Sequence, residues 1–478
     1  MPTVLPYPRV PSYRTAAEMV AALRGLGREM PVLDPFDPAP LLQPLSLGGL
    51  RAGNRFCVQP MEGWDGDADG RPSERTTRRW SRFGASGAKL IWGCEAVAVR
   101  PDGRANPHQL RLGPDTAGAL AELLAVLRRA HGPADDLVVG LQLTHSGRYC
   151  RPERKDRPQP RIAYHHPILD ARTGVGPKDD RCVWTDAELD ELLGAYARAA
   201  RLAGEAGFQF VDLKHCHGYL LHELLSARTR PGRYGGDFDG RTRFLREAVA
   251  AIRREAPGLR IGVRLSGFDS IPFRAGADGT GVPEPWDGPY AFGFGVRSDL
   301  PTEADLEEPR RFVRLLRQLD VAACNLTAGS PYYNPHVQRP AQYPPSDGYQ
   351  PPEDPLAGVA RQMAAARDLR AAAAGLPVVG SGYSYLQEHL PAVAAGAVAY
   401  GWTDAVGLGR MILAYPEFVR DCLDGRAPDR RRLCRTFSDC TTGPRLGMPS
   451  GCYPLDPLYR ESPEWREIQE WKKAAAGR

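Results

Sequence analysis

Short apolar segments alternate with longer amphipathic segments along most of the chain, starting near residue 45. Eight of the apolar runs are typical of buried strands, at residues 56–59, 90–93, 137–143, 208–214, 260–265, 321–326, 378–379 and 398–401. Helical patterns lie between them, at 116–130, 186–206, 242–255, 307–319, 356–374 and 385–394. Strands that alternate with helices indicate βαβ units and a parallel sheet. Eight runs suit a (β/α)8 TIM barrel, but a doubly wound sheet alternates in the same way, so the count leaves both open.

The regions outside this alternation predict an arm, two long loops and a tail. Residues 1–44 are rich in proline and leucine and contain one helical stretch, at 16–26. Segments 266–303 and 330–355 carry many Gly, Pro, Asp and Tyr residues without periodicity. Each follows a predicted strand, so in a barrel both loops would lie on the C-terminal, active-site face. We therefore expect an N-terminal arm (1–44), a barrel with long βα-loop insertions (45–425) and a C-terminal extension packed on the barrel (426–478).

Composition and charge narrow the class of protein. The chain has 478 residues, 42% of them hydrophobic and 25% charged, which excludes fibrous and wholly disordered proteins. The net charge is +5, and the densest basic cluster is the three arginines at 430–432, so we expect no nucleic-acid partner. We expect no membrane span, because no apolar run reaches about 18 residues. The proline-rich N-terminus does not resemble a signal peptide, which predicts a cytoplasmic protein.

Two of the predicted strands end in clusters of polar side chains. The first cluster begins at the end of the run 137–143 and includes Gln142, whose amide can donate and accept hydrogen bonds at the edge of a heterocycle. The second begins at the end of the run 208–214 and places Lys214, His215, His217 and Tyr219 within six positions, with Gly218 before the tyrosine. Alone, each cluster is also compatible with a polar cap at a strand end.

Together with other motifs, these clusters resemble the old yellow enzyme family, the FMN-dependent barrel oxidoreductases of the NADH:flavin oxidoreductase type. The resemblance covers roughly residues 45–425 and rests on motifs that occur in the family's order. They are Asn54-Arg55 with Gln59-Pro60-Met61, 90–95, 142–148, Lys214 to Leu221 followed by Tyr234-Gly235-Gly236, Arg264-Leu265-Ser266, Gly380-Ser381-Gly382, and Gly407-Leu408-Gly409-Arg410. It implies a (β/α)8 barrel that binds FMN, is reduced by NADH or NADPH, and acts on a small molecule.

The resemblance also implies the residues that bind the flavin, which are Pro60, Met61, Gly93, Gln142, Arg264, Gly380, Gly382, Gly409 and Arg410. Gln142 suits the pyrimidine edge of the flavin, and Arg264 would place positive charge near its N1 and O2 atoms. Barrels bind phosphate groups with the loops after strands seven and eight. We therefore expect Gly380, Gly382 and Gly409 to let the backbone approach the phosphate, and Arg410 to grip it.

The same resemblance implies three catalytic residues: Tyr219, His217 and Lys214. In the family a hydride moves from flavin N5 to an activated alkene, and a tyrosine, here Tyr219, donates the proton. His217 would hydrogen-bond the carbonyl that activates the alkene. Lys214 departs from the His or Tyr usual at its position, and it either contacts an anionic oxygen or forms a salt bridge with a buried carboxylate. For both Lys214 and His217 to line one site, the chain must turn between them.

Several alternatives remain open from the sequence. The Lys214 departure keeps oxidation of an amine or a ring C–H as the second function. His215 and His217 could instead ligate zinc in a metal-dependent hydrolase, with His145 as a further candidate ligand. A non-catalytic flavin-binding subunit is another alternative. The oligomeric state does not follow from the sequence, and a homodimer is compatible with it.

Cysteines near the C-terminus raise the question of a metal cluster. One branch of the family carries a 4Fe–4S cluster with the spacing C-x2-C-x3-C-x11-C after its barrel. Here Cys434, Cys440 and Cys452 keep only the last interval, and Phe437 stands in the place of the second cysteine. Three thiolates do not complete a four-cysteine cluster, so we predict no cluster and no other metal site.

Overall fold

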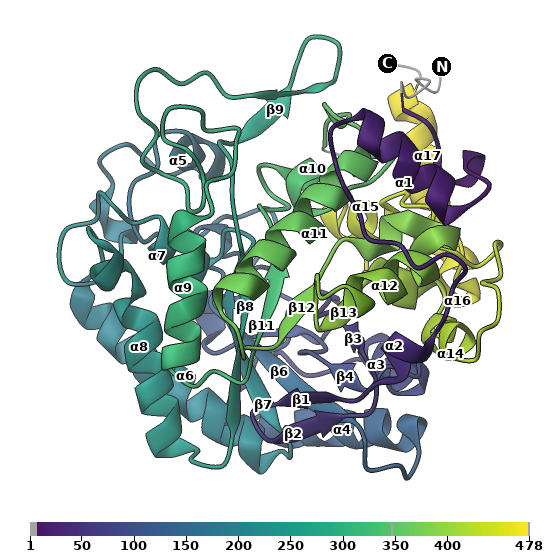
Figure 1. Cartoon of the computed structure of the whole chain (residues 1–478). Coiled ribbons are helices and arrows are strands. Elements are labelled where there is room, and N and C mark those ends of the chain that lie inside the picture. The colour runs from purple at the N-terminus through teal and green to yellow at the C-terminus, as the bar shows by residue number, and fades with distance from the viewer. Residues whose placement is uncertain (1–6, 346–347, 477–478) are drawn as a thin grey trace.

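Eight parallel strands pair side by side and close into a barrel in the computed structural model, which describes residues 7–345 and 348–476 (Figure 1). The strands are β3 (Phe56–Val58), β4 (Leu90–Ile91), β6 (Val138–Thr144), β7 (Phe210–His215), β8 (Arg260–Ser266), β11 (Ala323–Thr327), β12 (Val378–Gly380) and β13 (Ala405–Leu408). Pairing of β13 with β3 and of β4 with β6 completes the ring, and a ninth short strand, β5 (Ala96–Ala98), also pairs with β6 in parallel. The (β/α)8 barrel prediction is confirmed, and the doubly wound alternative is wrong because that sheet would have open edges.

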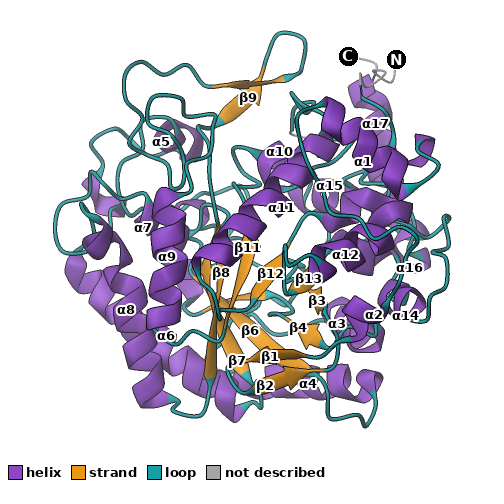
Figure 2. Cartoon of the chain, viewed as in Figure 1, coloured by secondary structure: helices purple, strands orange, loops and turns teal. Residues whose placement is uncertain are grey.

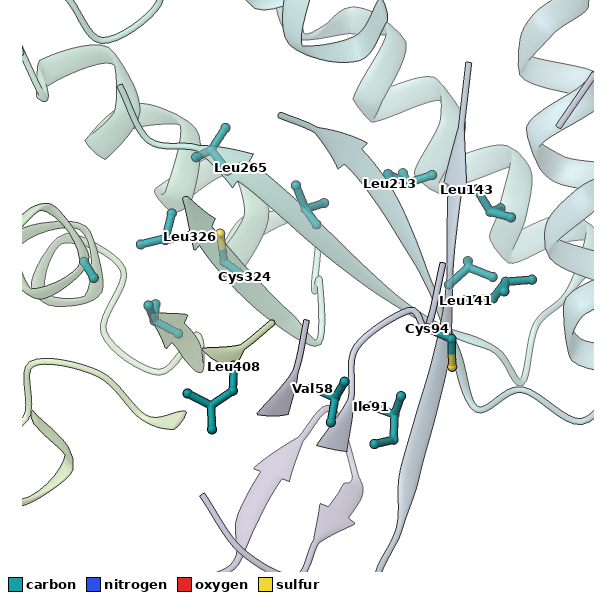
Figure 3. Close-up of a cluster of buried hydrophobic side chains, with 14 of the residues drawn as sticks. Val58, Ile91, Cys94, Leu141, Leu143, Leu213, Leu265, Cys324, Leu326 and Leu408 are labelled. Carbon is teal, nitrogen blue, oxygen red and sulfur yellow. The ribbon is translucent and has the colours of Figure 1, made fainter. Parts of the chain in front are cut away.

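Helices surround the strands on the outside of the barrel (Figure 2). The larger ones are α3 (Glu74–Ala85), α4 (Ala117–His131), α6 (Asp186–Glu205), α8 (Phe238–Glu255), α9 (Glu307–Gln318), α11 (Pro355–Ala372) and α12 (Leu390–Ala399). Apolar side chains on the outer face of the strands pack against them in one continuous cluster, part of which Figure 3 shows. This cluster includes Val58, Ile91, Leu141, Leu213, Leu265, Leu326 and Leu408 from neighbouring strands. The predicted strands are continuous apolar runs in the sequence because each strand is buried on both of its faces.

A short antiparallel hairpin closes the amino-terminal end of the barrel. It consists of β1 (Leu45–Leu47) and β2 (Leu50–Ala52), and the sequence pattern does not predict it. Leu45 and Leu47 belong to a second buried cluster with Trp92 and Phe210, whose rings meet edge to face at 5.2 Å. The barrel interior is therefore filled at this end, so any open space lies toward the carboxyl ends of the strands.

The eighth strand is not where the apolar pattern predicts it. Residues 398–401 were expected to form it, but α12 runs from Leu390 to Ala399 and the strand is β13, at Ala405–Leu408. The first eight residues of α12 are all buried, so the helix is apolar on every side and has no amphipathic period. A short apolar run at the end of such a helix cannot be told from a strand by periodicity. The Gly407 to Arg410 motif, in contrast, does coincide with the true eighth strand and its end.

Helix α3 is also absent from the predicted pattern, because Trp80 and Phe83 are the only large apolar side chains on its buried face, which also carries Arg79. Its start has a capping box in which Ser73 and Thr76 satisfy each other's backbone N–H groups. Arg78 of this helix forms a bidentate ion pair with the buried Asp456, with both N–O distances at 2.8 Å. Arg75 pairs with Glu464 at 2.8 Å. Helix α3 thus holds the C-terminal extension, which contains α15 (Asp439–Arg445), α16 (Pro457–Arg460) and α17 (Pro463–Ala476).

The two long segments predicted as loops lie above the carboxyl ends of the strands (Figure 1). Segment 266–303 contains a hairpin of β9 (Phe273–Ala275) and β10 (Gly281–Pro283), and segment 330–355 contains α10 (Pro335–Gln338). Residues 1–6, 346–347 and 477–478, which fall in the predicted arm, second loop and tail, lie outside the described residues. Over the described residues, every helix is too short or too polar to span a bilayer.

The contact between α3 and α4 gives a stability prediction. A Cβ atom at Gly84 of α3 would lie 2.0 Å from the backbone oxygen of Leu127, whereas a Cβ at Gly118 of α4 would meet nothing within 4 Å. Gly84→Ala is expected to lower the free energy of unfolding by about 1–3 kcal/mol, because the backbones must separate. Gly118→Ala is the control and should raise it by about 0.5–1 kcal/mol. Chemical denaturation measures both, and equal effects of the two substitutions would contradict the packing described.

Candidate active site

Two adjoining cavities lie at the carboxyl ends of the barrel strands. The first leaves about 860 Å³ free of protein atoms, and we call it the glycine-side cavity because Gly382, Gly407 and Gly409 line it. The second leaves about 790 Å³, and we call it the tyrosine-side cavity because Tyr219 and Tyr332 line it. The two share part of their walls, formed by Pro60, Glu62, His217, Arg264, Gln338, Arg339, Cys440, Thr441 and Ser450. A ligand long enough to extend through both would contact the ends of most barrel strands.

The glycine-side cavity has the chemistry of an anion site. Gly382 has a positive φ of 95°, and a Cβ atom at Gly407 would lie 1.8 Å from the Gln59 amide nitrogen, so side chains are excluded there. Arg410 is half-buried beside these glycines. Its Nη2 donates to the Pro340 carbonyl at 2.9 Å, while its Nη1 has no partner within residues 7–345 and 348–476. Burial lowers the pKa of Arg410, and a phosphate group would satisfy the remaining N–H groups.

A buried carboxylate orients two groups at the boundary of the cavities. Asp212 on β7 accepts a hydrogen bond from the Gln142 amide at 2.5 Å and another from the Arg264 backbone N–H at 2.6 Å. Because the Gln142 nitrogen is used in this way, its oxygen is directed away from Asp212. The Arg264 Nε is buried and has no partner in the part of the chain that the structure describes. Sequence reasoning missed Asp212, although it lies two residues before Lys214, on the same side of a regular strand.

A second carboxylate, Glu62, organises the tyrosine-side cavity. Its Oε1 accepts from Lys214 Nζ at 2.5 Å, and its Oε2 accepts from the Tyr219 hydroxyl at 2.9 Å. The Trp64 indole N–H also donates to Oε2, at 2.9 Å. Lys214 Nζ lies 3.7 Å from the centre of the Tyr219 ring, within the range of a cation–π contact. Of the two interpretations of Lys214, the salt bridge is therefore present, although its carboxylate, Glu62, is only partly buried.

Tyr219 is held as a neutral phenol. Burial raises its pKa well above the usual value, and the nearby Glu62 carboxylate raises it further. Its oxygen lies 3.0 Å from the Tyr332 hydroxyl. Since Tyr219 donates to Glu62, Tyr332 is the donor in this second contact. Tyr332 in turn stacks on Tyr149, with ring centres 3.8 Å apart. Neither Glu62 nor Tyr149 was predicted from the sequence. Glu62 follows directly after the Gln59-Pro60-Met61 motif, so its place beside that motif was a usable signal.

The chain turns between Lys214 and His217, as the sequence requires. Strand β7 ends at His215, and His217 has a left-handed φ of 66°. This turn lets both Lys214 and His217 line the tyrosine-side cavity. Burial lowers the pKa of His217 well below its usual value, and the nearby Arg264 and Lys214 charges lower it further, so its imidazole is neutral. Its Nε2 lies 3.3 Å from the Gln338 amide nitrogen.

His215 does not share this site. Its Nδ1 lies 2.9 Å from the Leu213 carbonyl, and its ring packs near Phe312 of α9 on the outside of the barrel. His145 is likewise buried elsewhere, edge to face with Trp184 at 5.0 Å. Among the described residues there is no group of three or more His, Cys, Asp or Glu side chains that could hold a metal ion. The geometry therefore gives no support to the zinc alternative.

The remaining predicted residues divide into two groups. Pro60 and Met61 line the glycine-side cavity, and Pro60 lines both. Gly93 and Gly380 lie behind the walls instead: a Cβ atom at Gly93 would lie 2.8 Å from that of Gln142, and one at Gly380 would lie 2.9 Å from the Tyr383 hydroxyl. Their role is therefore to make room for the residues in front of them.

The C-terminal extension forms part of the site, which the sequence did not predict. Cys440, Thr441 and Ser450 line both cavities, and Arg445 lines the tyrosine-side cavity. Cys434, Cys440 and Cys452 also border a small separate cavity together with Phe437 and Arg410. The three cysteines thus lie next to the glycine-side cavity, with Phe437 beside them.

Comparison with known proteins identifies relatives of this chain. Residues 40–280 match the family model of the NADH:flavin oxidoreductase / NADH oxidase family. An NADPH dehydrogenase of Geobacillus thermodenitrificans is 30% identical over 242 residues, which are 48% of this chain and 64% of that protein. An NADH oxidase of Thermoanaerobacter brockii is 25% identical over 399 residues, covering 83% of this chain and 52% of that protein. The chain thus spans between half and two thirds of the length of these relatives.

Solved structures share the fold. A 2-naphthoyl-CoA reductase superposes with a TM-score of 0.66 and 18% identity, covering 90% of this chain and 58% of the other. An old yellow enzyme homologue from Zymomonas mobilis superposes with a TM-score of 0.56 and 20% identity, covering 81% and 93%. A histamine dehydrogenase from a Rhizobium species gives 0.64 and 20%, covering 89% and 53%. The family match confirms the resemblance inferred from the motifs, with FMN as the cofactor of the family.

Asp212 gives a pH-dependence prediction. Burial raises its pKa from 3.8 to about 6, so the folded state resists its ionisation. The contribution of Asp212 to the free energy of unfolding is fully present below pH 4. It is lost as the pH rises toward 6, by about 3 kcal/mol in total. Asp212→Asn removes the titration. Between pH 4 and pH 7 the free energy of unfolding of the wild type should therefore fall by about that amount relative to the variant. Urea denaturation across this range measures the difference, and parallel pH profiles would contradict the assignment.

Proposed function

Because the chain belongs to the NADH:flavin oxidoreductase / NADH oxidase family, we propose that it is an FMN-dependent enzyme that is reduced by NADH or NADPH and then reduces an activated carbon–carbon double bond of a small molecule. The observation that carries this proposal is the neutral Tyr219 hydroxyl on the wall of the tyrosine-side cavity. Alkene reduction requires a proton donor for the second carbon, whereas amine oxidation does not.

The residues present fit FMN. When bound, FMN supplies a carrier of two electrons and a hydride. Arg410 and the backbone around Gly382 and Gly409 would hold its phosphate, because the Arg410 Nη1 is unsatisfied and the glycines leave space. Gln142 and Arg264 would contact its pyrimidine edge, with the orientation that Asp212 gives them. Positive charge from Arg264 at this edge favours the reduced cofactor, which carries negative charge there.

On the substrate side, each polar residue of the tyrosine-side cavity has a distinct role. The neutral His217 can donate one hydrogen bond to a carbonyl oxygen and so polarise the double bond. Tyr219 gives its proton to the α-carbon, and the Tyr332 hydroxyl, 3.0 Å away, can replace that proton. Glu62 keeps Tyr219 in position, and Lys214 balances the Glu62 charge at 2.5 Å. The charge pair thus allows a carboxylate next to the acid without leaving it buried and unpaired.

Substitution of Tyr219 tests the proposal. Tyr219→Phe is expected to slow the reoxidation of the reduced enzyme by an enone about 10²–10⁴-fold, because the general acid is lost. Reduction of the enzyme by NADPH should change little, since no proton from Tyr219 is needed there. Stopped-flow absorbance of the flavin separates the two half-reactions. Tyr400→Phe, at a position with 59% exposure, is the control. Equal enone reactivity of Tyr219→Phe and wild type would contradict the proposed acid.

Substitution of Arg410 tests the cofactor side. Arg410→Gln is expected to raise the dissociation constant of FMN by about 10–100-fold, the usual effect of losing a charged hydrogen bond. Fluorescence titration of the flavin-free protein with FMN measures the constant. Arg431→Gln is a suitable control because its side chain is 91% exposed. The same affinity for FMN in both variants would place the phosphate elsewhere.

A further inference from the structure

We infer that the substrate carries a negatively charged group, such as a carboxylate, and that Arg339 binds it. The inference rests on the proposed function, because it defines which activated alkenes the enzyme accepts. It depends on two features of the cavity walls: a cation position that the chain itself fills, and an arginine that uses only part of its hydrogen-bonding capacity.

The first feature disfavours substrates with an ammonium group. The Glu62 carboxylate and the face of the Tyr219 ring together form the kind of position that binds an ammonium ion. In this chain the Lys214 ammonium occupies it, 2.5 Å from Glu62 Oε1 and 3.7 Å from the ring centre. A substrate amine would have to displace Lys214 and would meet its charge.

The second feature is Arg339, at the end of α10, which lines both cavities. Its Nη1 donates to the Thr441 hydroxyl, but its buried Nη2 has no hydrogen-bond partner among residues 7–345 and 348–476. Over the same residues no carboxylate forms a salt bridge with it, in contrast to Arg148 and Arg79, which each bind two carboxylates. Arg339 as a whole is half-buried, whereas its Nη2 atom is buried. Burial and the neighbouring Arg410 charge lower the pKa of Arg339 to about 9. A buried guanidinium without an anion is unfavourable, so an anion that enters the cavity gains from pairing with it.

The position of Arg339 favours the substrate over the cofactor phosphate as the source of this anion. Arg410 lines the glycine-side cavity but not the tyrosine-side cavity, and it has its own unsatisfied Nη1 for a phosphate. Ser381 and Gly382 are likewise confined to the glycine-side cavity. Arg339, in contrast, shares the wall of the tyrosine-side cavity with Tyr219 and Lys214. An anionic substrate there would contact Arg339 while its double bond lies near the proposed acid.

A binding measurement tests the inference without turnover. Oxidised, FMN-containing enzyme is titrated calorimetrically with cyclohexanecarboxylate and with cyclohexanecarboxamide, which have the same shape and differ in charge. We expect the carboxylate to bind at least about tenfold more tightly, and Arg339→Gln to remove this difference. Arg339→Lys keeps the charge and should retain part of it. Equal affinity of the wild type for the two ligands would overturn the inference, and this comparison needs no variant.

Two further measurements separate the possible failures. If Arg339→Gln weakens FMN binding and changes the affinities for both ligands equally, the anion at Arg339 is the cofactor phosphate and the inference is wrong. In turnover, an enone with a carboxylate substituent should have a higher kcat/KM than its carboxamide analogue, and Arg339→Gln should lower the ratio at least about tenfold. Failure of every alkene, charged or neutral, to reoxidise the flavin would instead contradict the proposed function, whatever the binding preference.

Discussion

Closure of the strand ring is the constraint on which the rest of the structure depends. Pairing of β13 with β3 and of β4 with β6 leaves no open sheet edge, and it brings the carboxyl ends of all eight strands to one rim. Residues that are far apart in the sequence therefore meet there: Glu62 follows the first strand, Gln142 lies near the end of the third, Lys214 on the fourth and Arg264 on the fifth. The β1–β2 hairpin fills the other end, and the two adjoining cavities open on the rim that carries the polar residues.

Two carboxylates, the buried Asp212 and the partly buried Glu62, orient the side chains that meet at this rim. Asp212 holds Gln142 and the backbone of Arg264 on either side of its own strand, and Glu62 holds Lys214, Tyr219 and Trp64. Each side chain is oriented by a charge-assisted hydrogen bond, which is stronger and shorter than a neutral one. The other side of the site differs, because Arg339 and Arg410 each keep a nitrogen that has no hydrogen-bond partner among the described residues. The protein thus provides hydrogen bonds to its own acids and leaves N–H groups of two arginines for its ligands.

Much of the fold was predictable, and the errors have identifiable causes. Seven of the eight strands fall where the apolar runs predict them, because strands buried on both faces are continuously apolar. The eighth was misplaced because α12 is buried on every side and has no helical period. Helix α3 was missed because its buried face carries only two large apolar side chains, Trp80 and Phe83, and includes the ion-paired Arg79. Ion pairs with the C-terminal extension, such as that of Arg78 with Asp456, also stabilise it. The motif Gly407 to Arg410 located the eighth strand correctly where hydrophobicity did not.

The sequence by itself determined the alternation of strands and helices, because this depends on local patterns of apolar and polar side chains. Its strand-end motifs indicated the family and, through that resemblance, the barrel. The tertiary structure alone decided which of these residues face one another. It separated His215 from His217 by the left-handed turn at His217, joined Lys214 to Glu62, and added Cys440, Thr441 and Ser450 of the C-terminal extension to the cavity walls. Pairings of this kind join residues more than a hundred positions apart, and the spacing of residues along a chain carries no information about such contacts.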